Sequence, residues 1–562
     1  MAATPIDKKE FDFGSDNEPK VVLDSASVVS AEDRHFGTTS TAHRKFEPYH
    51  VNLIAIGGTI GTALFVYMGA GLTAGGPLAL LLGYTWWTSV IFCISEGQKE
   101  LCVQWPTDTA FARFAARYWD EAAGVAVGWN FWLSQVALVI FEVVAFGLVL
   151  GFWDSAQEVH PAVFISIVIV AYTALNIWNS RFFANAEFGA AVGKVLLITG
   201  LIIFTFVAML GGNPLNDRFG FRFWRNPGPL TTPYPQHSPA LGRFEGVLAC
   251  VINACFTVAG PDYLSMVAGE ARNPRPTMKR AFNATIYRLV IFFIGSALCI
   301  GILVPYNDSN LLRAQATAAP GGGRSPYVIA MRRLQIPVLP HIVNALILTS
   351  VFSAGNAFLF CASRSLAQMA RDGQAPKFLA RRNRHGVPWV AVAACLILSL
   401  LSYCQVSTTA QKVITYLTGL VGACQLVNWV VMSVTWIKWN AAMKAQGISR
   451  DTLYARSPLQ PFAAWYALIS SILVLFMQGY GVFLKDNWDT STFIFAYFAP
   501  AMFVVIFIGW KIVKRTKWET ALTADVTSFV DDPEFTEHID YESMERRSKS
   551  SRITHKVLST VF

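Results

Sequence analysis

The chain has 562 residues, of which 53% are hydrophobic and only 14% are charged. A soluble chain of this length would divide into several domains with polar surfaces. Here the apolar residues instead come in runs of about 20, long enough to cross the hydrocarbon core of a bilayer. The net charge of +9 does not indicate a nucleic-acid partner, because its Lys and Arg residues cluster in short loops between the apolar runs. We therefore predict an all-α membrane protein that crosses the lipid bilayer many times.

The first residues, 1–48, are polar and lack the basic and apolar pattern of a cleaved signal peptide. We predict a solvated, disordered cytoplasmic tail. It is either a passive extension or, through Lys8, Lys9 and Lys20, a target of the trafficking and ubiquitination machinery that controls turnover.

A twelve-helix domain is predicted over 49–514. Its spans cover residues 50–73, 77–102, 122–152, 160–180, 188–211, 244–268, 282–304, 338–368, 388–405, 411–438, 462–484 and 491–513. An even number of spans places both termini on one side of the membrane. The loops on that side, including 270–281 and 371–386, carry more Lys and Arg than the others, so the positive-inside rule predicts cytoplasmic termini.

The last segment, 515–562, alternates acidic and apolar positions from Thr516 onward. Two interpretations remain open for this cytoplasmic tail: a short amphipathic helix on the inner face of the protein, or an unstructured extension.

Two of the predicted spans are interrupted. The first contains "IAIGGTIGTALFV" (54–66), with three glycines and two threonines, and the sixth contains "CFTVAGPDYLSMVAGE" (255–270), with Gly260, Pro261 and Asp262. They lie five spans apart, as equivalents in an inverted repeat of five helices would. Secondary transporters bind solutes at such paired breaks, where bare N–H and C=O groups become ligands. The alternative for the first span is close helix packing through Gly57 and Gly61.

Three ionisable residues are predicted at membrane depth, where each charge costs a few kcal/mol. Glu142 lies in the middle of the third span. Either its charge is satisfied by a structural partner, or it belongs to a proton path or receives a cationic group of the substrate. Lys194 in the fifth span is either a snorkelling anchor or a buried, proton-releasing amine. Asp262 either meets a proton or a cationic group, or caps the resumed sixth helix. Glu96 and Glu100, at the end of the second span, are expected to pair with Lys99 or loop arginines.

No motif for covalent chemistry or for a cofactor is present, so we predict that the protein is not an enzyme. The nine cysteines lie in or beside apolar runs without CxxC spacing, and we interpret them as small buried hydrophobic residues rather than metal ligands or disulfides.

Several long motifs resemble those of the fungal plasma-membrane amino-acid permeases, within the amino acid–polyamine–organocation superfamily. Besides the first-span motif, they are "ARYWDEAAGVAVGWNFW" (116–132), "AGEARNPRPTMKRAF" (268–282) and "ARDGQAPKFLARRNRHGVPW" (370–389). The resemblance implies twelve transmembrane helices with a five-plus-five inverted repeat, LeuT-like, with discontinuous helices 1 and 6. It also implies uptake of an amino acid or related zwitterion across the plasma membrane by alternating access, with the proton as coupling ion and no other cofactor.

The resemblance further implies roles for individual positions. In Gly61-Thr62-Ala63, the N–H groups of Thr62 and Ala63 would hold a substrate carboxylate, and the Ala63 methyl group would narrow the pocket. The substrate ammonium would meet the carbonyls of Thr59, Phe256 and Ala259. Phe256 would also close over the substrate, and Thr257 would donate a hydrogen bond. Lys194 would occupy the place where sodium-coupled relatives hold an ion, against the first and eighth helices.

The motif "AGPDY" departs from the usual sixth-helix pattern and resembles a divergent subgroup linked to carnitine and polyamine uptake. A carnitine or polyamine permease therefore remains an alternative. A nutrient sensor of the same fold is a second alternative, in which the tails would signal.

Overall fold

The computed structural model describes residues 60–526, except 108, 178–179, 272, 318–324, 407–409 and 486. All of them belong to the larger of two parts of the chain, Ala42–Phe562. The predicted tail over 1–48, the site residue Thr59 and most of the segment 515–562 lie outside the described residues.

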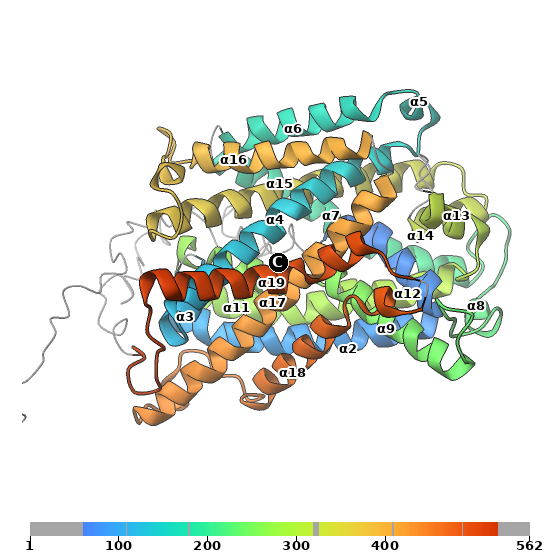
Figure 1. The fold of residues 1–562 in the computed structure, drawn as a ribbon. Coiled ribbons are helices and arrows are strands. Elements are labelled where there is room, and N and C mark those ends of the chain that lie inside the picture. The colour runs from blue at the N-terminus through green and yellow to red at the C-terminus, as the bar shows by residue number, and fades with distance from the viewer. Residues whose placement is uncertain are drawn as a thin grey trace, which may run out of the picture. The chain divides into compact units, whose positions relative to one another are not determined.

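The described residues fold almost entirely into helices (Figure 1). The helices that form the spans are α2 (Met68–Gln104), α4 (Glu121–Leu150), α6 (Pro161–Ile177), α7 (Ser180–Met209), α9 (Pro239–Thr257), α11 (Pro274–Arg288), which continues into α12 (Gly295–Leu303), α15 (Leu339–Arg371), α16 (Trp389–Ser399), α17 (Ala410–Ala445), α18 (Phe462–Met477) and α19 (Thr490–Lys514). The short ones are α3 (Ala110–Tyr118), α5 (Asp154–Gln157), α8 (Arg222–Arg225), α10 (Asp262–Met266), α13 (Ser309–Thr317) and α14 (Pro326–Arg333). Two π-helices, η2 (Ala63–Tyr67) and η4 (Leu289–Ile294), precede α2 and α12.

Nine helical stretches among the described residues are long and apolar enough to cross a membrane. One of them, Ala63–Gln104, has 42 residues and would measure about 63 Å as one helix, twice the hydrocarbon thickness. It is divided at Gly76, whose φ of 83° is not helical, so it supplies two spans. The nine stretches, one of them divided in two, thus give ten spans. The shorter apolar helices α6 and α18 add two more, so the described part of the chain has twelve spans, as predicted.

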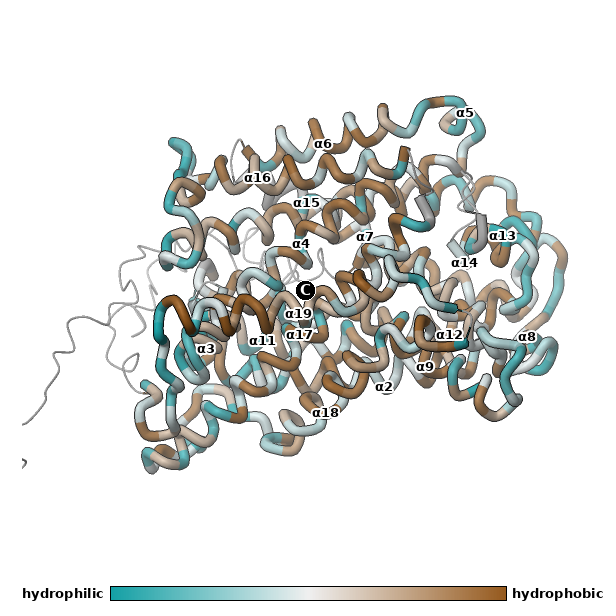
Figure 2. The backbone as a smooth tube through the Cα atoms, viewed as in Figure 1, coloured by the Kyte–Doolittle hydropathy of each residue, from teal (hydrophilic) through white to brown (hydrophobic). Residues whose placement is uncertain are grey.

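The helices run alongside one another, and their connections gather at two ends (Figure 1). We call these the α8 end, where α5, α8, α13 and α14 lie, and the α3 end, where α3 and the connection between α17 and α18 lie. Hydrophobic residues predominate along the helices and hydrophilic residues at the two ends (Figure 2). This distribution is the one a bilayer requires.

The helices differ in how deeply they are buried within the protein. The most apolar window of the span Lys412–Ala445 is 83% buried, whereas that of α19 is only 11% buried. The exposed side chains of α19 include Val504, Val505 and Ile512, which suit contact with lipid tails. Consequently α17 belongs to the core and α19 to its periphery.

The helix ends differ from the predicted spans mainly where polar residues continue a helix beyond the apolar run. The fifth helix begins at Ser180 rather than 188, the seventh at Pro274 rather than 282, and the tenth ends at Ala445 rather than 438. The ninth is shorter: α16 ends at Ser399, and a 3₁₀-helix (Leu400–Val406) completes it.

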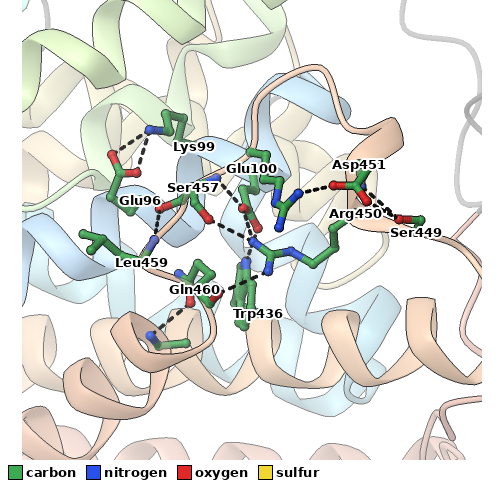
Figure 3. Close-up of polar contacts among 12 residues, drawn as sticks. Glu96, Lys99, Glu100, Trp436, Ser449, Arg450, Asp451, Ser457, Leu459 and Gln460 are labelled. Atoms are coloured by element: carbon green, nitrogen blue, oxygen red, sulfur yellow. Dashed lines mark hydrogen bonds and ion pairs between the residues drawn. The ribbon is translucent and has the colours of Figure 1, made fainter.

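A buried carboxylate joins three segments at the α3 end (Figure 3). Glu100 of α2 accepts hydrogen bonds from Arg450 Nη2 (2.5 Å), the Ser457 backbone N–H (2.7 Å) and Trp436 Nε1 (2.9 Å). Lys99, the residue before Glu100, pairs with Glu96, which lies one turn earlier on the helix. Lys99 Nζ is 2.6 Å from Glu96 Oε2. The predicted pairing of Glu96 and Glu100 with Lys99 and a loop arginine is therefore confirmed.

The segment from Arg515 to Val526 is not a helix, so the amphipathic-helix alternative is wrong for these residues. It follows α19 and packs on the α3 end instead: the Glu519 N–H donates to the Trp119 carbonyl (3.0 Å), and Arg117 pairs with Asp525 (2.6 Å). Ala524 and Val526 are buried. The prediction that all nine cysteines are buried is wrong for one of them: Cys404 is exposed, and the other eight are buried.

Candidate functional site

The first helix is irregular where the glycine and threonine residues predicted it. Gly61 and Thr62 lead into the π-helix η2, a geometry that occurs mostly at functional sites. Side chains from other helices satisfy main-chain carbonyls on either side: Ser350 of α15 donates to the Ile60 carbonyl (3.2 Å), and Asn253 of α9 donates to the Tyr67 carbonyl (3.1 Å).

The sixth helix is broken where Gly260 and Pro261 predicted it. Helix α9 ends at Thr257, Val258 is extended, and the chain becomes helical again at Asp262. Position 260 requires glycine, because a Cβ atom would lie 2.5 Å from Trp429 Nε1 and 2.6 Å from Asp262 Oδ2. The Thr257 hydroxyl donates to the Asn253 carbonyl of its own helix (2.8 Å), so this donor is already used.

A cavity of about 120 Å³ lies between the first helix, α4, α15 and α17. The residues of the described part of the chain that form its wall are uncharged: Thr62, Val66, Tyr67, Ala70, Phe141, Ala145, Leu148, Val149, Gln315, Ser325, Asn344, Ile414 and Thr415. Of the predicted site residues that the structure describes, Thr62 alone is in this wall. Ala63 is not, so its methyl group does not narrow this cavity.

Phe256 lies directly behind two residues of the cavity wall. Its ring centroid is 4.9 Å from that of Tyr67 and 5.1 Å from that of Phe141, both in edge-to-face arrangement. Such contacts stabilise an aromatic cluster by about 0.5–1.5 kcal/mol each beyond their apolar burial. The three rings thus form one closed layer between the cavity and the break after α9.

Glu142 of α4 reaches the first helix. Its carboxylate accepts a hydrogen bond from the Thr62 hydroxyl. Two glycines allow this approach: a Cβ on Gly61 would lie 2.8 Å from Glu142 Oε1, and a Cβ on Gly355 would lie 3.0 Å from the Cβ of Glu142. The carboxylate is 2% exposed, so it is enclosed by protein just behind the cavity wall.

Lys194 is buried in the protein, and the snorkelling interpretation is wrong. Its side chain is 1% exposed, and Nζ lies 3.7 Å from Glu187 Oε1 on the same helix. Ser353 of α15 donates a hydrogen bond to the same oxygen (2.8 Å). Lys194 and Glu142 are close enough to interact electrostatically, so the two predicted residues belong to one cluster.

Glu187 was missed by the sequence analysis. It is seven residues before Lys194, which places both on one face of a helix after two turns. An acidic residue at this spacing inside an apolar run is the signal that identifies the pair.

Asp262 lies apart from this cluster. Its carboxylate accepts a hydrogen bond from Trp429 Nε1 (3.1 Å). Pro261 occupies the N-cap position of α10 and Asp262 is the first residue of that helix, so Asp262 is not its N-cap residue. Oδ1 of Asp262 has no hydrogen-bond partner within the described residues.

The geometry therefore provides a neutral cavity and, behind its wall, a cluster of three ionisable groups. The cavity can hold a small solute through hydroxyl, amide and main-chain groups. The cluster of Glu142, Lys194 and Glu187 can exchange protons without exposing a charge to the solute. Nothing in this arrangement performs covalent chemistry.

Comparison with known proteins agrees with this geometry. The model of the amino acid permease family matches residues 50–522. The chain is 40% identical over 499 residues to the general amino acid permease AGP2 of Saccharomyces cerevisiae, which covers 88% of this chain and 83% of that protein. It is 35% identical over 475 residues (84% and 86%) to a proline-specific permease of Emericella nidulans. It is 33% identical over 487 residues (87% and 77%) to the lysine-specific permease of S. cerevisiae.

These matches span nearly all of the twelve helices and confirm both the resemblance and the LeuT-like fold that it implies. They also confirm a membrane transporter rather than an enzyme. The chain belongs to the amino acid permease family.

Proposed function

We propose that this permease takes up an amino acid or a related zwitterion across the plasma membrane together with protons. The observation that carries the proposal is the contact between Thr62, in the cavity wall, and Glu142, in the buried ionisable cluster. A solute that binds against Thr62 changes the surroundings of a carboxylate that shares its cluster with Lys194. Binding of the solute and binding of a proton are thereby linked.

The neutral wall of the cavity supports a zwitterionic substrate. Because the described wall residues are uncharged, opposite charges of one solute would be met by main-chain groups, as in other transporters with broken helices. We assign the N–H groups of Thr62 and Ala63 to the carboxylate. The carbonyls of Phe256 and Ala259, which lie beyond the aromatic layer, are assigned to the ammonium from the resemblance and would meet it when that layer opens. The carbonyl of Thr59 is assigned to the ammonium from the resemblance alone.

Alternating access would use the two broken helices. The aromatic layer of Tyr67, Phe141 and Phe256 separates the cavity from the break after α9, and its opening would pass the substrate onward. The α3 end would face the cytoplasm together with both termini, because its short connections are basic, as the positive-inside rule requires.

Uptake of radiolabelled substrates into a yeast strain that lacks its own permeases tests this proposal. We expect accumulation of at least one amino acid, faster at acidic external pH and abolished by a proton uncoupler. The panel should include polyamines and a quaternary amine such as carnitine. Uptake that is insensitive to the uncoupler contradicts proton coupling, and binding without accumulation identifies a sensor.

A matched pair of lysine substitutions tests the role of Lys194. Lys194→Met is expected to abolish accumulation. Lys99→Met removes another buried lysine, which is paired with Glu96 at the α3 end, and is expected to retain accumulation per molecule at the cell surface. Normal uptake by Lys194→Met contradicts the role of Lys194 in coupling.

A further inference from the structure

We infer that Glu187 is a second proton-carrying carboxylate of the transport cycle and that Lys194 connects it to Glu142. The inference rests on the proposed proton coupling and adds a residue and a direction to it. The proton would move from the carboxylate beside the cavity to the one beside α15.

The surroundings of Glu187 differ from those of a structural carboxylate. Ser353 donates to Oε1, and the ammonium of Lys194 lies 3.7 Å from that atom, longer than the 2.7–2.9 Å typical of a hydrogen-bonded ion pair. Oε2 has no hydrogen-bond partner in the described part of the chain, although the side chain is only 2% exposed. The second oxygen is thus available to a proton.

Glu100 shows what a structural carboxylate looks like in the same protein. It is also buried, but it accepts hydrogen bonds from Arg450, Trp436 and a main-chain N–H at 2.5–2.9 Å. Three donors at short distance compensate the burial of its charge. Glu187 has one short hydrogen bond and the Lys194 ammonium at 3.7 Å, so its charge is met by fewer close donors than that of Glu100.

Charge counting gives the number of protons in the cluster. Glu142, Glu187 and Lys194 together carry a net charge of −1 when all are ionised, and a neutral cluster results when one proton is added. Tyr172 of α6 is the other titratable side chain that interacts with both carboxylates, and its hydroxyl donates to the Phe352 carbonyl (3.0 Å). Because each buried ion costs several kcal/mol, the cluster with one bound proton is favoured over the charged one.

The positions of the two carboxylates give the direction of transfer. Glu142 faces Thr62 in the cavity wall, and Glu187 faces Ser353 on α15. A proton from the cavity side binds Glu142 and passes to Lys194 as the ammonium gives one of its own protons to Glu187. An O–H bond is broken at Glu142, one N–H bond is formed and another broken at Lys194, and an O–H bond is formed at Glu187, so Lys194 ends the step unchanged. Water that reaches Glu187 when the transporter changes its conformation would then accept the proton.

Glu187→Gln separates proton coupling from substrate passage. The amide keeps the shape and can still accept a hydrogen bond from Ser353. We expect this variant to exchange labelled for unlabelled substrate across the membrane with little change in KM, to lose uphill accumulation, and to lose the pH dependence of uptake. A residue that only supports the fold would instead reduce exchange and accumulation together and leave the pH profile unchanged.

Glu245→Gln is the matched control, because Glu245 is equally buried and accepts a hydrogen bond from Tyr480 (2.9 Å) outside this cluster. It is expected to keep accumulation and the pH profile. If the wild type is proton-coupled and Glu187→Gln still accumulates substrate, the inference on Glu187 is wrong and the proposed function stands. If the wild type itself ignores the uncoupler, the proposed function fails.

A measurement on the wild-type protein covers the case in which Glu187→Gln does not fold. A hydrophobic carbodiimide modifies protonated carboxyl groups in apolar surroundings, and peptide mass spectrometry locates the product. We expect modification of Glu187 that declines as the pH rises, with Glu100 unmodified throughout. Modification of Glu142 without Glu187 at every pH contradicts the inference.

Discussion

The hydroxyl of Thr62 donates a hydrogen bond to the carboxylate of Glu142, and this contact joins the first helix to α4 across 80 positions of the sequence. Thr62 lines the cavity, whereas Glu142 is buried behind it. The bond is therefore a direct route from the cavity wall to the ionisable cluster.

Substitution of Thr62 tests this route. Thr62→Val keeps the shape but leaves a buried carboxylate without this donor, which costs about 1–3 kcal/mol, equivalent to a loss of about 5- to 150-fold in the uptake rate if it falls on the transport step. Thr62→Ser keeps the hydroxyl and is expected to retain most of the uptake. Thr257→Val is the control, because the Thr257 hydroxyl donates to the Asn253 carbonyl of its own helix and lies outside the described cavity wall, and it should have a small effect. Equal losses in Thr62→Val and Thr257→Val would contradict the assigned route.

Glu100 provides a test of stability rather than of transport. Glu100→Gln removes the counter-charge of the Arg450 guanidinium, whose side chain is 15% exposed (Figure 3). Loss of one partner of a fully buried pair costs about 3–5 kcal/mol, so we expect a cost toward the lower end of that range. We expect a clear fall in the melting temperature of the purified protein in detergent. The double variant Glu100→Gln/Arg450→Gln should recover part of that loss.

Asp451 supplies the matched control in the same connection. It pairs with Arg456, but both side chains are more than half exposed. Exposed ion pairs contribute about 0–1 kcal/mol, so Asp451→Asn should leave the melting temperature nearly unchanged. Equal effects of Glu100→Gln and Asp451→Asn would show that burial does not set the strength of the Glu100 contacts.

Local sequence patterns correctly predicted the spans, the break in the sixth helix and one ion pair. The length of the apolar runs set the twelve spans, and Gly260 with Pro261 located the break in the sixth helix. The pairing of Glu96 with Lys99 follows from their spacing of three residues on one helix. Each of these features depends on residues that are close in the chain.

The features that sequence patterns missed or left open depend on residues that are far apart. Asp262 and Trp429 are separated by 167 positions, and the folded chain, in which α9 packs against α17, brings them together. The burial of Lys194 likewise depends on α15, which supplies Ser353 to its partner Glu187. In the segment after α19, main-chain groups bond to Trp119 and Gln446, which lie just beyond the ends of α3 and α17, and these contacts replace the helix that the alternating pattern allowed.

An ion pair at the α8 end is expected to make stability depend on pH. Arg222 donates two hydrogen bonds to the carboxylate of Asp217 (2.6 and 2.9 Å), and these bonds lower the pKa of Asp217 from its ordinary value. Because the folded state then binds the proton less readily than the unfolded state, the pair stabilises the protein above the ordinary Asp pKa of about 3.9. That contribution is lost as the pH falls through the lowered pKa.

Melting temperatures of wild type and Asp217→Asn across a pH series measure this effect. The difference between them is expected to be constant from about pH 7 to pH 5 and to shrink below about pH 4. Asn213→Ala is the control, because Asn213 holds the same loop by uncharged hydrogen bonds to the carbonyls of Ala208 and Asp217. Its destabilisation should not change with pH, and a constant difference for Asp217→Asn would contradict the expected loss of the ion pair.

Asp120 connects the start of α4 to the segment that follows α19. Its side chain, which is completely buried, accepts a hydrogen bond from the Ala122 N–H (2.8 Å) and thereby caps α4. It also accepts a hydrogen bond from the Thr516 hydroxyl (2.8 Å) and pairs with Lys511. One carboxylate thus stabilises a helix end and holds the segment 515–526 against the α3 end.

A graded series of substitutions separates these contributions. Asp120→Asn keeps a capping oxygen but loses the ion pair with Lys511, whereas Asp120→Ala loses the cap as well, a further cost of about 1 kcal/mol. Thr516→Val removes a single hydrogen bond. We expect the melting temperature to fall in the order wild type, Thr516→Val, Asp120→Asn, Asp120→Ala. Proteolysis after Lys517 should become faster in the same order, because release of the segment exposes that site. Unchanged cleavage in Asp120→Ala would show that Arg117 and Gln446 hold the segment without Asp120.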